Sequence, residues 1–444
     1  MAKKTINKEL TGAQDLYNFL FEACNIIRGP VSQDNFKDYI TPLLYYKRIS
    51  DVYDEETEEA LISSGGDKEY ASLPEQHRFV IPDGCHWQEV RERTENLGAA
   101  IVGAMRQIEI ANPDTLYGVL SMFSSQKWTN KAILNDSKIR DLIEHLSKRK
   151  LGNKDYPADL MGDAYEILLK KFADDSKAQA GEFYTPRSVV RLLVHILDPQ
   201  PGETVYDPAC GSGGMLIEAI RYMHDDSLCC GSIFGQEKNV VNAAIAKMNL
   251  FLHGASDFNV MQGDTLRDPK ILQGGNIAKF DCVIANPPFS LENWGATEWS
   301  SDKYKRNIYG TPSDSCGDYA WIQHMICSMS SGKGRMAVVM PQGILFRGNQ
   351  EAEIRKQLVE SDLIEAVVTL GDKLFYGTGL SPCFLIIRRM KPAHHSGRIL
   401  MIDGSKILTQ KRAQNILEEN DIDRLYSLYQ NYSDEEDYSR IVTL

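Results

Sequence analysis

Short apolar stretches alternate with helical stretches over residues 160–404, and this alternation limits the fold more than any other feature of the sequence. Segments such as 215–223 and 240–252 carry apolar residues at helical spacing between the short stretches. The alternation predicts an α/β fold with a doubly wound, parallel sheet. The last strands follow one another without a long helix, which predicts an antiparallel pair at one end. The expected strands are 204–207, 232–236, 258–262, 281–286, 335–340, 364–370 and 383–388.

Two regions flank this core. Residues 1–155 carry apolar side chains at helical spacing, which predicts a helical N-terminal domain. Residues 405–444 predict a short helical C-terminal tail, and the strand-forming piece 440–444 has nothing after it to pair with. We therefore expect that the chain is truncated or that its tail packs on a partner. The predicted domains are 1–155, a core of 156–404, and 405–444.

Composition excludes several classes of protein. The 444 residues include 49 Lys and Arg against 61 Asp and Glu, a net charge of −12, which disfavours binding of a polyanion by the chain alone. With 25% charged and 43% hydrophobic residues, the chain is neither disordered nor a small disulfide scaffold. The nine cysteines lack C-x-x-C spacing and read as reduced thiols. Without a signal peptide or a run of about 18 apolar residues, we expect a cytoplasmic protein.

A glycine-rich loop follows the first expected strand. The segment from Asp207 to Gly214 reads Asp-Pro-Ala-Cys-Gly-Ser-Gly-Gly, and a helix is expected after it. Glycines at this point allow a ligand to approach the backbone closely. Leu216 occupies the third glycine position of G-x-G-x-x-G, which disfavours a dinucleotide. The sequence also has no Gly-Lys-Ser/Thr, so it has no P-loop.

Three acidic residues end or follow successive strands. Asp207 suits a positively charged α-amino group, Glu237 suits two ribose hydroxyls, and Asp264 suits an adenine amino group. A nucleoside with an amino-acid arm and no phosphate fits all three, and that ligand is S-adenosylmethionine. The alternative is that these are ordinary acids that cap helices.

The fourth strand ends in a turn rich in hydrogen-bond acceptors. Asn286, Pro287, Pro288 and Phe289 follow the apolar segment 281–285, and neither proline offers an N–H donor. The Asn286 side-chain oxygen and the Pro287 carbonyl are suited to hold the two N–H groups of adenine N6, while Phe289 stacks on the base. Such a target must leave the duplex to be reached. The alternative is a strand end stiffened by prolines.

With these motifs, the sequence resembles the DNA amino-methyltransferases that act on adenine N6, and most closely the modification subunit of type I restriction–modification systems. The resemblance covers roughly residues 10–430 and implies a seven-stranded, Rossmann-like core that depends on S-adenosylmethionine, with no metal and no general-base histidine. Family subunits usually run longer at the C-terminus. The resemblance assigns chemistry to Asn286, Pro287, Pro288 and Phe289. Residues expected to contact the cofactor are Glu182, Phe183, Tyr184, Thr185, Pro186, Arg187, Asp207, Ala209, Gly211, Ser212, Gly213, Gly214, Glu237 and Asp264.

A polar segment after the Asn-Pro-Pro-Phe turn, 290–312, interleaves aromatic and basic residues. We expect a mobile loop that engages the flipped strand and becomes ordered on DNA. The alternative is an ordinary surface loop with packed aromatics. The residues concerned are Trp294, Trp299, Tyr304, Tyr309, Lys303, Lys305 and Arg306.

Sequence recognition is expected to come from another chain, because no further module of suitable size or basic domain remains. The resemblance implies a specificity subunit joined by two copies of this chain, with a restriction subunit added for cleavage. Three other functions stay open: methylation of a protein glutamine, methylation of cytosine N4, and a non-catalytic assembly role.

Overall fold

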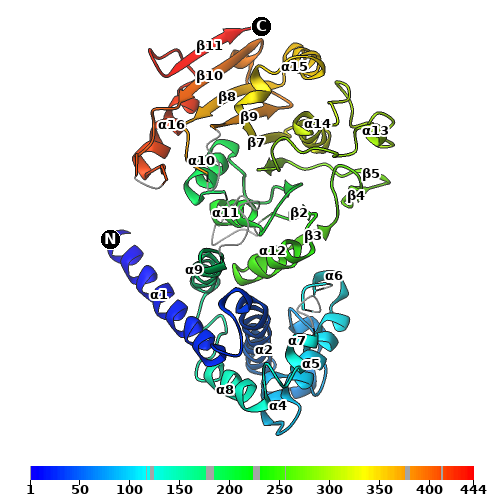
Figure 1. Ribbon diagram of the computed structural model, residues 1–444, viewed down its shortest axis with the longest axis vertical. Helices are drawn as coiled ribbons and strands as arrows, with labels where there is room; N and C mark the ends of the chain where they lie inside the picture. Colours follow the sequence, from blue (N-terminus) through cyan, green and yellow to red (C-terminus); the bar gives the residue numbers. More distant parts are fainter. Residues whose placement is uncertain are drawn as a thin grey trace. The chain divides into compact units, whose positions relative to one another are not determined.

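The computed structural model describes residues 2–116, 118–120, 125–176, 185–223, 231–255, 257–375, 381–411 and 414–444. The chain divides into a helical unit, residues 1–178 with 247–254, and a sheet unit, residues 179–246 with 255–444 (Figure 1). Within the described ranges, none of the helices combines the length and the apolar character needed to cross a membrane.

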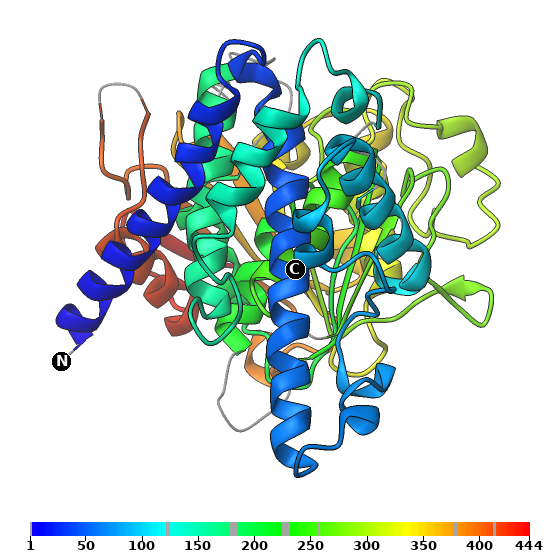
Figure 2. The ribbon, with the colours of Figure 1, turned by 90° about the horizontal axis from the view of Figure 1, so that it is seen from below.

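The helical unit confirms the expectation for the first 155 residues. In α2, the apolar side chains of Ile40, Leu43 and Leu44 recur at helical spacing and are buried. Helix α1 packs along α9 and α8 (Figure 2). The helices are α1 (Ala2–Ile27), α2 (Lys37–Ser63), α3 (Lys68–Ala71), α4 (Trp87–Glu92), α5 (Leu97–Ala111), α6 (Pro113–Leu116), α7 (Ser125–Thr129), α8 (Asp136–Leu146) and α9 (Ala158–Ser176), with 3-10 turns η1 (Gln33–Asn35) and η2 (Pro74–Gln76).

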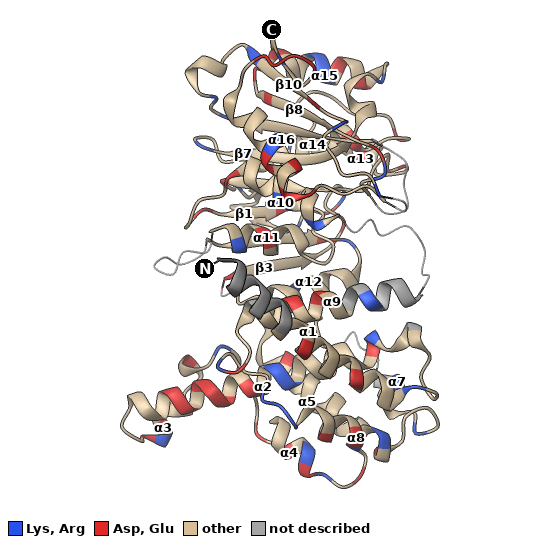
Figure 3. Ribbon diagram, turned by 90° about the vertical axis from the view of Figure 1, so that its left-hand side faces the viewer, with Lys and Arg blue, Asp and Glu red and all other residues tan. Residues whose placement is uncertain are grey.

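Acidic residues gather along the C-terminal half of α2 (Figure 3). Asp54, Glu58 and Glu59 are exposed and Glu56 is half-buried. The Glu55 carboxylate accepts hydrogen bonds from the N–H groups of Asn153, at 2.6 Å, and Lys154, at 3.1 Å. The run is therefore a solvated helix face that also anchors the segment before α9.

The sheet unit is built on one sheet of nine strands across the described residues, in the order β11-β10-β8-β9-β7-β6-β1-β2-β3. All seven predicted strands are present, with ends that differ by no more than one residue from those expected. Strands β3, β2, β1, β6 and β7 run parallel to one another. Their bounds are β1 (Val205–Asp207), β2 (Ile233–Glu237), β3 (Phe258–Gln262), β6 (Cys282–Ala285), β7 (Arg335–Pro341), β8 (Ile364–Leu370), β9 (Pro382–Arg388), β10 (Arg398–Gly404) and β11 (Ser439–Thr443), while β4 (Leu272–Gln273) and β5 (Asn276–Ile277) form a separate hairpin.

An antiparallel pair does lie at one end of the sheet, but it is formed by β10 and β11. Strand β9, one of the last predicted strands, lies inside the sheet between β7 and β8 and is antiparallel to both. A second expectation is corrected. The C-terminal segment does have a partner, because β11 pairs antiparallel with β10 from Arg398↔Thr443 to Ile402↔Ser439. Residues 398–404 were not recognised as a strand, and they provide the edge on which the last residues of the chain pair.

Helices cover both faces of the sheet. Helices α14 and α15 pack on one face, where Tyr206, Val283 and Met336 point, and α10, α11 and α16 lie on the other (Figure 1). Because β1, β2, β3 and β6 are parallel, their carboxyl ends meet at one edge of the sheet. The helices of this unit are α10 (Arg187–Leu197), α11 (Gly214–Met223), α12 (Val240–Leu252), α13 (Ala296–Trp299), α14 (Asp318–Ser328), α15 (Gln350–Glu360) and α16 (Glu419–Asn431), with 3-10 turns η3 (Gln342–Leu345) and η4 (Ala393–His395).

Candidate functional site

The glycine loop after β1 turns tightly onto α11. Gly211 and Gly213 adopt φ values of 54° and 86°, a left-handed conformation that glycine accepts without strain. A Cβ added to Gly211 or Gly214 would meet open space within 4 Å, whereas one on Gly213 would lie 3.4 Å from Ala246. The loop therefore keeps bare backbone next to free volume on the side of Gly211, and it packs tightly against α12 at Gly213.

Asp207 lies at the base of this loop and is only 2% exposed. Its Oδ1 accepts a hydrogen bond from the N–H of Ala209 at 2.9 Å, which shapes the turn. Burial, and secondarily the negative charge of Glu237, raise the pKa of the Asp207 carboxyl to about 8. A cation placed beside Asp207 would relieve this unfavourable charge, as expected for a partner with an α-ammonium group.

Glu237 and Asp264 follow the next two strands and accept backbone hydrogen bonds. Glu237 Oε2 accepts from the N–H of Gly211 at 2.9 Å, and its Oε1 accepts from Asn239 at 2.7 Å. Asp264 Oδ1 accepts from Leu266 and Arg267 at 3.2 Å, and its Oδ2 lies 2.9 Å from Lys238 Nζ. A carboxylate has about four acceptor positions, so one or two backbone bonds leave room for a ligand. Loop capping and ligand binding are therefore compatible in these residues.

The Asn-Pro-Pro-Phe turn comes directly after β6. Asn286 Nδ2 donates a hydrogen bond to Thr185 Oγ1 at 2.7 Å. Asn286 Oδ1 is buried and has no hydrogen-bond partner among the described residues. A buried acceptor without a donor is unfavourable, and in native proteins it usually marks a functional position. The amide is thus oriented by Thr185, and one acceptor is left unused.

A second group of residues fixes the end of this turn. Ser290, with φ of 50°, donates its backbone N–H to Asp318 Oδ1 at 2.7 Å. Asp318 is 1% exposed and forms an ion pair with Arg347. Sequence analysis missed the roles of Asp318 and Arg347, because neither lies in a motif and their proximity arises from the packing of α14 against the turn after η3.

The other predicted residues are distributed as follows. Thr185 contacts the Asn286 turn, and Pro186 precedes α10, which begins at Arg187. Ala209, Ser212 and Phe289 are half-buried, Pro287 is buried and Pro288 is exposed. Glu182, Phe183 and Tyr184 lie outside the described residues.

The segment 290–312 differs from the mobile loop that was expected. Trp294 and Trp299 are each 2% exposed and pack edge-on with ring centroids 5.5 Å apart. Arg306 is 1% exposed, donates to the carbonyls of Thr265 and Leu266 at 2.9 and 2.8 Å, and pairs with Asp302 at 2.8 Å. Trp294 also donates its indole N–H to the carbonyl of Ser313 at 2.8 Å. These three side chains are packed inside the protein and hold the segment in place. Exposed basic side chains remain at Lys303 and Lys305, and Tyr304 and Tyr309 are half-buried.

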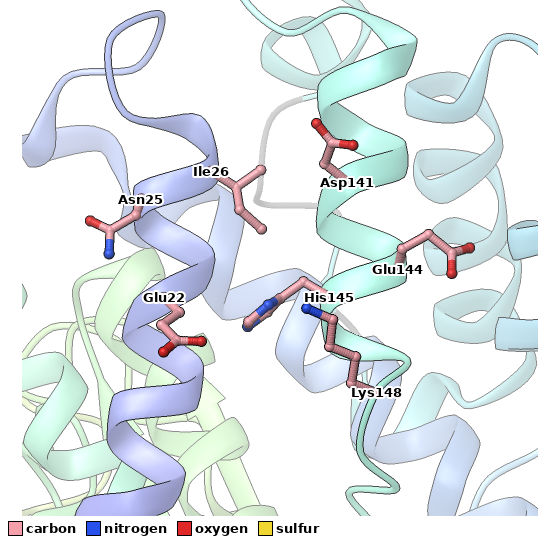
Figure 4. A pocket seen from close by; sticks show the side chains of 7 residues that line it. All are labelled: Glu22, Asn25, Ile26, Asp141, Glu144, His145 and Lys148. Atoms are coloured by element: carbon pink, nitrogen blue, oxygen red, sulfur yellow. The ribbon is translucent and has the colours of Figure 1, made fainter.

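The helical unit contains a shallow pocket of about 470 Å³ between α1 and α8 (Figure 4). His145 already bonds through Nε2 to the carbonyl of Phe19 at 2.9 Å, and Glu144 pairs with Arg91 at 2.7 Å. The imidazole of His145 and the carboxylate of Glu144 are thus already engaged within the protein. Its lining residues are Glu22, Asn25, Ile26, Asp141, Glu144, His145 and Lys148.

Two family models match the chain. The model described as N-6 DNA Methylase matches residues 156–444, and the model described as HsdM N-terminal domain matches residues 16–146. The first match covers the whole sheet with its glycine loop and Asn-Pro-Pro-Phe turn.

Curated relatives have similar sequences over most of this chain. The MjaVII methylase subunit of a type I restriction enzyme from Methanocaldococcus jannaschii is 34% identical over 90% of this chain and 70% of the relative. The MjaVIII methylase subunit from the same organism is 32% identical over 98% of this chain and 76% of the relative.

Solved structures share the fold. The methyltransferase subunit of a type I restriction–modification system from Streptococcus thermophilus aligns with a TM-score of 0.82 at 25% identity, covering 97% of this chain and 96% of that one. A candidate class I S-adenosylmethionine-dependent methyltransferase from Listeria monocytogenes aligns with a TM-score of 0.51 at 15% identity, covering 74% of this chain and 98% of that one. The second likeness concerns the fold alone.

Proposed function

The chain belongs to the N-6 DNA methylases, as the adenine-specific modification subunit of a type I restriction–modification system, and from this premise we propose how its residues divide the reaction. Asn286, Pro287, Pro288 and Phe289 hold the target adenine. The loops after β1, β2 and β3 hold S-adenosylmethionine. The observation that carries this proposal is the buried Asn286 Oδ1, which has no donor within the described part of the chain while Thr185 fixes the amide.

The residues at the carboxyl ends of β1, β2 and β3 fit the cofactor. Open space beside Gly211 and Gly214 leaves room for a ligand against bare backbone, and the buried Asp207 carboxyl suits an ammonium group. Glu237 then accepts from ribose hydroxyls and Asp264 from the adenine amino group. S-adenosylmethionine supplies a methyl group made electrophilic by its sulfonium. Ala209, Ser212 and Gly213 complete the cofactor-binding loop after β1. The segment from Glu182 to Arg187 contacts the same cofactor.

The target side acts through hydrogen-bond geometry. The lone pair of adenine N6 is delocalised into the ring, so the free base is a poor nucleophile. Asn286 Oδ1 and the Pro287 carbonyl accept the two N6 hydrogens, which draws the nitrogen toward tetrahedral geometry and aims its lone pair at the methyl donor. Phe289, which is half-buried, stacks on the base. The adenine must first leave the duplex, since the N6 atom is not accessible inside the base stack.

Partners complete the assembly that this proposal requires. We assign double-stranded DNA as substrate, a specificity subunit that binds two copies of this chain, and a restriction subunit for cleavage. The net charge of −12 supports a partner that supplies the basic surface for the phosphates. The helical region 1–155 then serves assembly, and the core 156–404 serves catalysis. Residues 405–444 add β11 to the edge of the sheet.

The test is transfer of a tritiated methyl group from S-adenosylmethionine to unmethylated genomic DNA, by this chain alone and with its specificity subunit. We expect label on adenine N6 only in the mixture. Label in protein, or in cytosine, would contradict the assignment of the substrate. Label on DNA from the chain alone would contradict the need for a partner that recognises the sequence.

A further inference from the structure

A phenylalanine is held in solvent beside the catalytic turn. Phe346 directly follows η3 (Gln342–Leu345) and is 74% exposed. Strand β7 leads into η3, and β7 pairs in parallel with β6, so the turns after the two strands leave the same edge of the sheet. Ala285, the last residue of β6, is in register with Val338, and Asn286 follows it. Phe346 therefore belongs to the loop next to the one that holds the target base.

The backbone around Phe346 is fixed from several sides. The carbonyl of Ile344 accepts hydrogen bonds from Tyr319 Oη at 2.7 Å and from Arg355 Nη1 at 3.1 Å. The same Arg355 nitrogen donates to the carbonyl of Arg347 at 2.9 Å, and Ile344 is 1% exposed. The exposure of Phe346 therefore does not result from a loosely held loop. The anchored backbone holds the apolar ring of Phe346 in contact with water, which is unfavourable.

The same loop is tied to the Asn286 turn. Arg347, next to Phe346, pairs with Asp318, whose Oδ1 receives the N–H of Ser290 at 2.7 Å. Ser290 directly follows Phe289. Phe346 is therefore adjacent to Arg347, whose ion pair with Asp318 supports the end of the Asn286 turn.

The only ionisable side chain among residues 342–350 is that of Arg347, and it pairs with two carboxylates, those of Asp318 and of Glu351 at 3.2 Å. The loop that carries Phe346 therefore presents no net charge of its own. Exposed Lys303 and Lys305 lie on the segment after the Asn286 turn. A DNA duplex at the Asn286 turn would meet these two lysines with its phosphates and Phe346 with its bases.

We propose that Phe346 enters the base stack of the target duplex and fills the space that the flipped adenine leaves. Apolar side chains inserted between bases are a recurrent device for opening a duplex, and the flipped base must be replaced by something that stacks. This inference rests on the proposed function of the Asn286 turn and adds a residue that acts on the DNA rather than on the reacting atoms.

The test uses the complex of this chain with its specificity subunit and a duplex carrying the site found by sequencing the methylated genomic DNA. Single-turnover methyl transfer is measured for wild type and Phe346→Ala on the matched duplex and on one in which the target adenine faces a mismatch. Stacking of one aromatic on a base corresponds to about tenfold in rate, so we expect a loss of that size on the matched duplex. On the mismatched duplex, where extrusion costs less, the loss falls to about twofold.

Two variants serve as controls. Phe346→Trp retains a stacking ring and should restore the rate on the matched duplex. Met390→Ala removes a side chain that is 71% exposed and follows β9, whose end lies at the opposite edge of the sheet, in register with Arg335 at the start of β7. We expect it to leave the rate on both duplexes unchanged.

The outcomes separate this inference from the proposed function. An equal loss on both duplexes, or no loss, overturns the role of Phe346, as does failure of Phe346→Ala to co-elute with the specificity subunit, which would assign the ring to a protein contact. If wild type methylates the duplex and Asn286→Ala does not, the proposed function stands whichever way Phe346 behaves. If wild type labels no adenine on either duplex, the proposed function itself fails.

Discussion

The carboxyl ends of β1 and β6 form the two sides of the proposed site, and they are built from opposite kinds of chemistry. On the β1 side, Asp207 and Glu237 are carboxylates that already accept backbone N–H groups. On the β6 side, Asn286 is a neutral amide whose buried oxygen meets no donor among the residues that the structure describes, followed by two residues that have no N–H. The first side has surplus negative charge, and the second has surplus neutral acceptors.

This difference matches two different ligands. A charged ligand can be held by ionic attraction, and the raised pKa of Asp207 shows a carboxyl that gains from a nearby cation. A neutral aromatic amine offers only its N–H groups, so neutral acceptors can orient it without placing another charge beside the reacting nitrogen. Binding and orientation are thus separable in this site, and substitutions should separate them.

The largest effect should come from Asn286→Ala. We expect methyl transfer to fall by roughly 10²–10³-fold, in the range seen when one preorganised hydrogen-bonding group is removed from an active site. Affinity for S-adenosylmethionine should stay within about twofold, because that ligand is held from the β1 side. Single-turnover kinetics and calorimetry measure the two quantities. A parallel fall in cofactor affinity and in rate would erase the distinction between the two sides.

The next effect should be that of Asp207→Asn on cofactor affinity. Asparagine keeps an oxygen for the N–H of Ala209 but loses the charge, so the dissociation constant should rise roughly 10- to 100-fold, as for loss of a hydrogen bond to a charged group. The rate at saturating cofactor should change little. A lower rate with unchanged cofactor affinity would mean that Asp207 acts in methyl transfer and not in binding the cofactor.

The pH dependence of binding checks the same residue. Because the pKa of Asp207 is raised to about 8, the ionised fraction grows as pH rises toward 8, and cofactor affinity should increase about tenfold between pH 6.0 and 7.5. This range lies below the titration of an α-amino group. In the cofactor-free chain the sign is opposite: Asp207 contributes stability below its unfolded pKa of about 3.9, and that contribution is lost as pH rises through 8. Asp207→Asn should show neither trend.

A smaller effect is expected from Thr185→Val, which removes the acceptor that orients the Asn286 amide. Methyl transfer should drop roughly five- to tenfold, the size of one ordinary hydrogen bond. Thr185→Ser is the matched control, since it keeps Oγ1 and should retain most of the rate. If valine weakens cofactor binding instead of the chemical step, Thr185 serves the cofactor, as the family resemblance implies.

The smallest effect should be that of Lys238→Ala. The Lys238 side chain is 71% exposed, and an ion pair with so exposed a partner contributes little, although the Asp264 side chain is half-buried. Asp264 would keep its bonds to the N–H groups of Leu266 and Arg267. Cofactor affinity should change by less than about twofold in calorimetry. A tenfold change would mean that the cofactor side depends on a cation as well as on carboxylates.

Local patterns in the sequence were sufficient to locate seven strands of the sheet, but not β10. Strand ends such as Ile364 and Leu370 could be located because a buried strand is a mostly apolar run between polar turns. The pairing of β11 with β10 and the position of β9 between β7 and β8 were not predictable, since strand order depends on long-range packing.

In the site, too, residues that belong to local motifs could be predicted, whereas residues brought there by long-range packing could not. Asp207, Glu237 and Asn286 were predicted because each stands at the end of a recognisable strand. Asp318 and Arg347 were not, because their partners lie on other elements, and Arg306 was taken as a DNA contact although it is buried. A basic residue in a polar stretch gives no local sign that carbonyls from a distant loop will enclose it.

Arg306 also sets a condition for engineering this enzyme. Its guanidinium donates to the carbonyls of Thr265 and Leu266, next to Asp264, while Asp302 and the ring of Trp299 hold it within the segment that follows the catalytic turn. The loop after β3 and the segment after β6 are therefore joined through Arg306, and also through Arg267, whose Nη2 donates to the carbonyl of Asn293. A graft that exchanges one of these loops with a relative must bring the other loop along, or the transplanted half will lack its anchor.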